Sequence, residues 1–187
     1  MEELHYEDLA SSGMIHPGDI ILSAFPGSAL AKAILAGQSL ISQAPANWGH
    51  AMRASSPTTV ISQEWKVVER SLKAWRGQRL RVWHNPAYTP AQRERLVTET
   101  RLALGRSYDL LGLIGQGLRA VPVVGQWLGE ALELPWLTYC SELVCFTERK
   151  VNPQFMEPYP TCQVSPQEID DWLSMQDGWE PATFKLA

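Results

Sequence analysis

Short apolar segments alternate with turn residues over the first half of the chain, and this pattern predicts β-strands. The run GDIILSAF at 18–25 is rich in Ile and is typical of a buried strand. Four more segments have strand length and are separated by turn residues such as Pro57 and Gly77. They are 48–55, 58–65, 66–72 and 80–84. Because neighbouring strands joined by short turns pair with one another, the sequence predicts an antiparallel sheet.

The hydrophobic period becomes that of helices in the second half. Segment 89–105 opens with Thr89 and Gln92 in the spacing of a capping box, with a proline at its first helical position and a glycine at its end. The other expected helices are 28–42, the segment that Cys140 opens, and the segment after Ser165. Strands and helices in one chain without β-α-β alternation indicate the α+β class.

The chain has 187 residues, which suits one domain. We expect residues 1–16 to form an N-terminal lead-in and 17–187 a single domain that carries an apolar insertion at 110–137. That insertion is long enough to span a bilayer, but it contains Arg119, Glu130 and Glu133. Each charge at membrane depth costs about 2.5–3.5 kcal/mol, so we expect an apolar hairpin or lid that can contact a membrane surface without spanning it.

Charge and cysteine content narrow the function classes. The formal charge of −4 argues against a nucleic-acid partner, which needs a basic surface. Three cysteines without a C-x-x-C pair argue against a disulfide framework and fit a reducing compartment. The acidic N-terminus has no apolar core of a secretory signal, so we expect a cytoplasmic protein, or one exported by a signal-independent route.

No cofactor or metal is expected from the sequence. Neither the G-x-G-x-x-G nor the G-x-x-x-x-G-K-[ST] nucleotide fingerprint occurs. Histidines at positions 5, 16, 50 and 84 are too scattered to predict zinc from their spacing.

Cysteine chemistry remains. In TYCSELVCF (138–146), Cys140 precedes a helix-like run, and the partial positive charge of a helix N-terminus favours a thiolate. A lone cysteine is more often a packed core residue, and we expect that of Cys145 and Cys162. A nucleophilic Cys140 needs a base, for which His50 at the start of a strand is the best candidate. A residue of the next strand, Gln63 or Glu64, would orient the imidazole; these two point to opposite faces, so only one can do so.

Several motifs occur in the order typical of one family. They are GDIIL at 18–22, WGHAMR at 48–53, VISQEW at 60–65, VERSL at 68–72, LGRSYD at 104–109, YCSELV at 139–144 and SP at 165–166. Over about residues 17–170 the chain thereby resembles the YiiX/YebB-like proteins. These form the circularly permuted branch of the NlpC-type, papain-like cysteine peptidases.

The resemblance implies a circularly permuted papain-like fold, with a small antiparallel sheet or barrel packed against helices and the histidine strand before the cysteine helix. Cys140 would be the nucleophile and His50 the general base and acid. The chain departs from the expected V-I-E-A motif: Gln63 takes the glutamate's place if one turn residue is missing, and Glu64 does so if the strand is shifted. We favour Gln63 narrowly.

Aromatic residues near the implied site are candidates for substrate binding, and core packing is the alternative role for each. They are Tyr139, Trp48 and Trp65. The implied activity is hydrolysis of an amide bond in bacterial cell-wall peptides.

Two other functions stay open. One is hydrolysis or transfer of an acyl-lipid or thioester, as in the lecithin:retinol acyltransferase group, which the apolar 110–137 segment favours. The other is a non-catalytic binding module on the same fold. The oligomeric state is not predicted.

Overall fold

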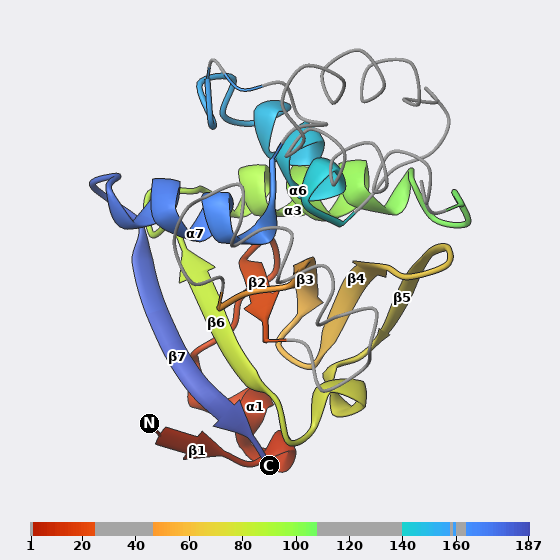
Figure 1. Ribbon diagram of the computed structural model, residues 1–187, viewed down its shortest axis with the longest axis vertical. Helices are drawn as coiled ribbons and strands as arrows, with labels where there is room; N and C mark the ends of the chain where they lie inside the picture. Colours follow the sequence, from red (N-terminus) through yellow and green to blue (C-terminus); the bar gives the residue numbers. More distant parts are fainter. Residues whose placement is uncertain (1, 25–46, 108–139, 158, 160–163) are drawn as a thin grey trace, which may run out of the picture.

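The structure is a computed structural model that describes residues 2–24, 47–107, 140–157, 159 and 164–187. Within these residues the chain is α+β, as the sequence predicts, with a mixed seven-stranded sheet beside helices (Figure 1). The expected helix over 28–42, the apolar segment 110–137, Tyr139 and Cys162 lie outside the described residues.

The sheet has the strand order β1-β7-β6-β2-β3-β4-β5. Its strands are β1 (Glu2–Leu4), β2 (Ile20–Ser23), β3 (His50–Ser56), β4 (Thr59–Gln63), β5 (Val67–Ser71), β6 (Arg79–His84) and β7 (Glu180–Leu186). All neighbours are antiparallel except β1 and β7, which are parallel. The predicted antiparallel sheet is therefore confirmed from β2 to β6. Strands β1 and β5 form the two edges, so the sheet is open.

The described helices are α1 (Leu9–Ser12), α3 (Pro90–Arg101), α6 (Cys140–Arg149) and α7 (Pro166–Ser174), with short 3-10 turns η1 (Tyr6–Asp8) and η2 (Leu72–Trp75). The predicted capping box of Thr89 with Gln92 opens α3, and a second one, of Ser165 with Glu168, opens the helix expected after Ser165, α7. Each box satisfies two backbone N–H groups that a helix start otherwise leaves without partners. These local bonds explain why the helix starts could be located from the sequence.

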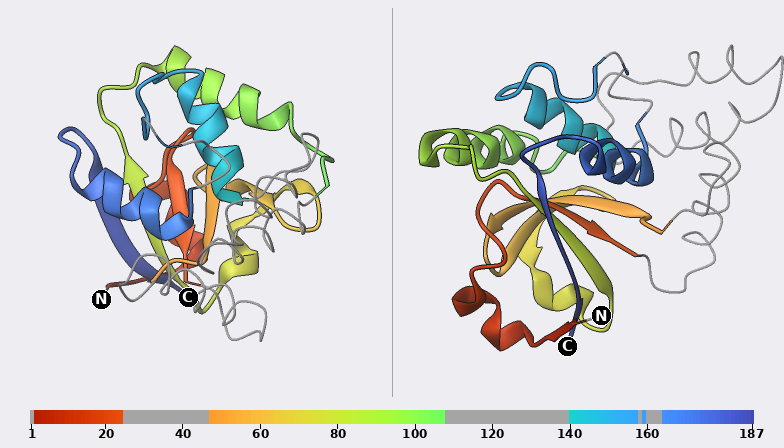
Figure 2. Two further views of the ribbon diagram at one scale, coloured as in Figure 1. Left: turned by 45° about the horizontal axis from the view of Figure 1, so that its top comes forward. Right: turned by 90° about the vertical axis from the view of Figure 1, so that its left-hand side faces the viewer.

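Each face of the sheet has its own cover. Helices α3, α6 and α7 lie over one face, and the N-terminal segment and η2 lie against the other (Figure 2). Leu9 and Ile15 are fully buried against that second face. Within the predicted lead-in, residues 2–16 pack against the sheet, because β1 pairs with β7 and the apolar side chains of this segment complete a core.

A buried ion pair joins α6 to the sheet. Nη1 of Arg53 on β3 lies 2.6 Å from Oε2 of Glu148 on α6, and both side chains are fully buried. The Arg53 guanidinium also donates to the carbonyl oxygens of Gly18 (2.7 Å) and Val144 (3.1 Å). Tyr88 donates to the Glu148 carboxylate at 2.6 Å. Strand β3, helix α6 and the turn before β2 thus share one buried charged cluster.

We predict that Arg53→Met lowers the free energy of unfolding by about 3–5 kcal/mol, because it leaves the Glu148 carboxylate buried without its counter-charge. The double variant Arg53→Met, Glu148→Leu removes both charges and should recover most of that loss. Urea unfolding, monitored by circular dichroism, gives the free energy of unfolding of the wild type and of both variants. Equal destabilisation of the single and double variants would contradict the prediction.

Candidate active site at the start of helix α6

Cys140 is the first residue of α6 and is 7% exposed. Burial is the largest influence on its thiol and raises its pKa above the ordinary value. The backbone N–H groups of Ala51, Ser141 and Cys140 itself act in the opposite direction and lower the pKa by less. The thiol is therefore protonated at neutral pH in this state. The thiolate that a helix start favours does not form, since desolvation outweighs the local dipoles.

The start of α6 is fixed by a side-chain bond. The Ser141 hydroxyl donates to the carbonyl oxygen of Val164, just before α7. Val144 and Cys145 pack with core residues of the sheet face that α6 covers. Cys145 is fully buried and burial raises its pKa, as suits the packing role expected of it.

His50 is the first residue of β3, and its ring is buried. Its Nε2 lies 2.8 Å from Oγ of Ser62 on β4. The Trp75 indole lies nearly parallel to the ring, with centroids 6.4 Å apart. Burial lowers the pKa of His50 to about 4. The imidazole is therefore neutral at pH 7, the form that can accept a proton.

Cys140 and His50 approach each other through the backbone of β3. Since side chains alternate along a strand, His50 shares its face with Met52 and Ser62, the face that the N-terminal segment covers. Ala51 belongs to the face that α6 covers, and its N–H acts on the Cys140 sulfur. The sulfur thus contacts the peptide group between His50 and Ala51 on the helix side of β3, whereas the His50 ring belongs to the other face by alternation.

Ser62 contacts the His50 ring, and the sequence reasoning missed this residue. Gln63 is buried and lies on the α6 side of β4 by alternation. Glu64 follows the end of β4 and accepts two hydrogen bonds from Arg70. The roles of Gln63 and Glu64 as orienting residues stay predictions. The signal for Ser62 was the strand register: with Met52 opposite Ser62, even-numbered residues of β3 and β4 share a face.

The candidate substrate-binding aromatic residues differ in exposure. Trp48 is 2% exposed, and its Nε1 donates to Asp170 of α7 at 2.8 Å. The guanidinium groups of Arg79 and Arg81 lie 4.6 and 5.2 Å from its ring centroid. Trp48 is thus a packing residue in this structure, while Trp65 is 77% exposed. Binding of substrate by either residue stays a prediction.

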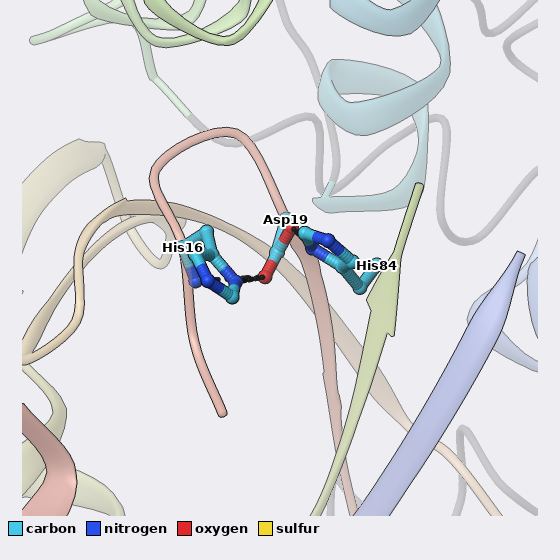
Figure 3. Close-up of side chains that lie close together, drawn as sticks. All are labelled: His16, Asp19 and His84. Carbon is cyan, nitrogen blue, oxygen red and sulfur yellow. Dashed lines mark hydrogen bonds and ion pairs between the residues drawn. The ribbon is translucent and has the colours of Figure 1, made fainter. Parts of the chain in front are cut away.

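A second cluster of reactive side chains lies at the other end of β2. It consists of His16, Asp19 and His84. Each of these residues has one potential metal-ligand atom, and these three atoms lie within 4.8 Å of one another (Figure 3). His16 and His84 are far apart in the sequence, so their spacing gave no sign of this cluster. The fold brings them together because β6, which ends at His84, pairs with β2 directly after Asp19.

Comparisons of the chain with protein-family models, with curated proteins and with solved structures find no match. The geometry described above therefore carries the functional argument. In the part of the chain that the structure describes, no helix has the length and apolar character needed to cross a membrane.

The lowered pKa of His50 predicts a pH dependence of stability. In the unfolded chain the ring protonates near its ordinary pKa of 6.5, whereas in the folded protein it does so only near 4. As the pH falls from 6.5 to 4, protons bind the unfolded state preferentially, so the free energy of unfolding falls, by up to about 3 kcal/mol. His50→Gln should remove this part of the slope in urea titrations at several pH values.

The exposed His5 supplies a matched control for that measurement. His5→Gln replaces an exposed histidine and leaves His50 in place, so the His50 contribution to the slope should remain. An identical slope in wild type and His50→Gln would show that the folded ring is not held neutral.

Proposed function

We propose that this protein is a cysteine hydrolase that cleaves an amide bond, with Cys140 as the nucleophile and His50 as the general base and acid. The observation that carries the proposal is the position of the Cys140 thiol. It lies at the first residue of α6, among backbone N–H groups and one peptide unit from His50. The resemblance to YiiX/YebB-like, permuted papain-like peptidases supplies the substrate class, peptides of the bacterial cell-wall type.

The protonation states suit a neutral pair. With a raised thiol pKa and a lowered imidazole pKa, the resting site holds a thiol and a neutral imidazole. His50 takes the thiol proton while the sulfur forms a bond to the substrate carbonyl carbon. It then gives that proton to the leaving nitrogen as the C–N bond breaks, which leaves a thioester. Water hydrolyses the thioester and restores the thiol, with His50 as the base.

The surrounding groups have roles in this scheme. Ser62, in contact with Nε2 of His50, holds the ring so that Nδ1 serves as the reacting nitrogen. Backbone N–H groups at the start of α6 stabilise the oxyanion of the tetrahedral intermediate. The scheme requires the imidazole to come within hydrogen-bond distance of the sulfur in the substrate complex. Catalytic hydrogen bonds are often long without substrate and shorten when it binds.

The fold class is compatible with the proposal. In a permuted papain-like protein the histidine strand precedes the cysteine helix, and the two elements pack together. Here β3 precedes α6, and the Arg53–Glu148 ion pair joins them.

A second candidate is the non-catalytic binding module. The observation that favours it is the burial of Cys140, which raises the pKa of its thiol. In that case Cys140 only packs. Acyl-lipid or thioester chemistry rested on the 110–137 segment, which is outside the described residues.

Digestion of purified muropeptides, followed by liquid chromatography and mass spectrometry, tests the proposal. We expect new amine and carboxylate termini from the wild type, and a loss of at least about a thousandfold in rate for Cys140→Ala, which lacks the nucleophile. Ser62→Ala should lower kcat by about 10–100-fold with little change in KM, because it loosens the ring without touching substrate.

Cys145→Ala is the matched control, since it removes a buried thiol from the same helix. Turnover retained in Cys140→Ala would refute the nucleophile. Release of fatty acid from phospholipid vesicles, with muropeptides intact, would replace the amide substrate by an acyl one. No turnover of either substrate by the folded wild type would favour the binding module.

A further inference from the structure

Three side chains with metal-binding atoms converge where β2 begins and β6 ends. His16 and Asp19 belong to the turn before β2, and His84 is the last residue of β6 (Figure 3). The Asp19 carboxylate lies between the two rings: its Oδ2 is 3.6 Å from Nδ1 of His16, and its Oδ1 is 2.9 Å from Nδ1 of His84. The ring centroids of His16 and His84 are 4.5 Å apart.

The backbone holds this arrangement in place. The His16 N–H donates to Oδ2 of Asp19 at 2.8 Å, and the Asp19 carbonyl oxygen accepts the Ala54 N–H at 2.9 Å. Asp19 is 1% exposed, whereas the His16 and His84 side chains are 46% and 21% exposed. The carboxylate is therefore fixed in the interior, and the imidazoles close the cluster toward solvent.

We propose that His16, Asp19 and His84 bind one Zn²⁺ ion through their two Nδ1 atoms and one carboxylate oxygen. Two imidazoles and a carboxylate are a ligand set that Zn²⁺ takes, with a fourth position for water. In tetrahedral zinc sites with bonds of about 2.0–2.2 Å, neighbouring ligand atoms are about 3.3 Å apart. The observed contacts of 2.9 and 3.6 Å run to the two different oxygens of Asp19, and the three ligand atoms lie within 4.8 Å of one another. Rotation of the carboxylate and of the half-exposed His16 ring would bring one oxygen and both Nδ1 atoms to that spacing.

Arg93 on α3 competes with the metal. Its Nη1 lies 3.1 Å from Oδ1 of Asp19, and its Nη2 lies 3.3 Å from Nε2 of His84. Without metal, Nδ1 of His84 and Nη1 of Arg93 both lie within hydrogen-bond distance of Oδ1 of Asp19. When Zn²⁺ binds, the ligating Nδ1 atoms carry no proton, and the guanidinium moves away from the carboxylate oxygen that the ion takes.

Close packing keeps Arg93 at this position. A Cβ built on Gly18 would lie 3.2 Å from the Arg93 Cα, and Gly18 has a φ of +90°. Only glycine adopts such a φ without strain, and its missing side chain lets α3 approach the turn before β2. The arginine is thus a fixed neighbour of the site, which makes its removal informative.

The zinc cluster is separate from the candidate active site. Asp19 precedes the first residue of β2, whereas His50 is paired with Ser23 at the last. Metal binding therefore does not depend on the proposed hydrolase activity, and each proposal can fail alone.

The test uses the full chain and measures Zn²⁺ affinity at pH 7.5 by competition with a chromogenic chelator. We expect one Zn²⁺ per chain, and at least about a tenfold loss of affinity in His16→Asn and in His84→Asn. Arg93→Met should bind Zn²⁺ about tenfold more tightly, because it removes the competing cation. His5→Asn, which changes an exposed histidine outside the cluster, should bind as the wild type does.

His16→Asn is the variant least able to disturb folding, since its side chain is half exposed and its backbone bond to Asp19 remains. Thermal unfolding without metal checks that each variant is folded. Co²⁺ substitution gives an independent reading, because tetrahedral nitrogen and oxygen ligation produces intense visible absorption that His16→Asn should lose. Unchanged Zn²⁺ affinity in both histidine variants, or weaker binding in Arg93→Met, would overturn the proposal.

Discussion

The buried pair of Arg53 and Glu148 is the constraint on which the rest of the structure depends. A guanidinium and a carboxylate without water are tolerated only where each has its partner and further hydrogen bonds. Arg53 meets that condition by also donating to Gly18 and Val144, and Glu148 by accepting from Tyr88. These bonds fix α6 against β3, and with it the place where the Cys140 sulfur meets the Ala51 peptide. They also fix Gly18, directly before Asp19.

Burial, rather than charge, sets the chemistry proposed at Cys140. Desolvation disfavours both the thiolate and the imidazolium, so it raises one pKa and lowers the other. A thiolate–imidazolium pair would need a more polar environment than this state provides. The neutral pair can still react, because the proton moves from sulfur to His50 only as the sulfur attacks. Because the His50 ring and the Cys140 thiol belong to different faces of β3, substrate binding must bring the two groups together.

Local signals in the sequence predicted those parts of the fold that local bonds decide. The capping boxes at Thr89 and Ser165 are satisfied within a few residues, and strands β4 to β6 follow short connections. Strand β7 was not predicted, because Glu180 and Pro181 at its start interrupt the alternation of apolar and polar residues. Its pairing partners, β6 and β1, are distant in the sequence. Ser62 needed the β3–β4 register, and the His16–Asp19–His84 cluster needed the pairing of β2 with β6. Contacts that depend on the pairing of distant strands cannot be predicted from the spacing of residues along the chain.

The central claim is that Cys140 and His50 act together in the substrate complex. The most direct measurement is therefore the rate, against pH, at which a muropeptide-based electrophile that occupies the substrate site alkylates each cysteine. Peptide mass spectrometry resolves the cysteines in the wild type and in His50→Ala. The account predicts that Cys140 reacts faster than Cys145 at neutral pH, and that His50→Ala slows Cys140 by at least about tenfold while leaving Cys145 unchanged. A Cys140 rate that is the same with and without His50 would contradict the account and leave Cys140 as a packed residue.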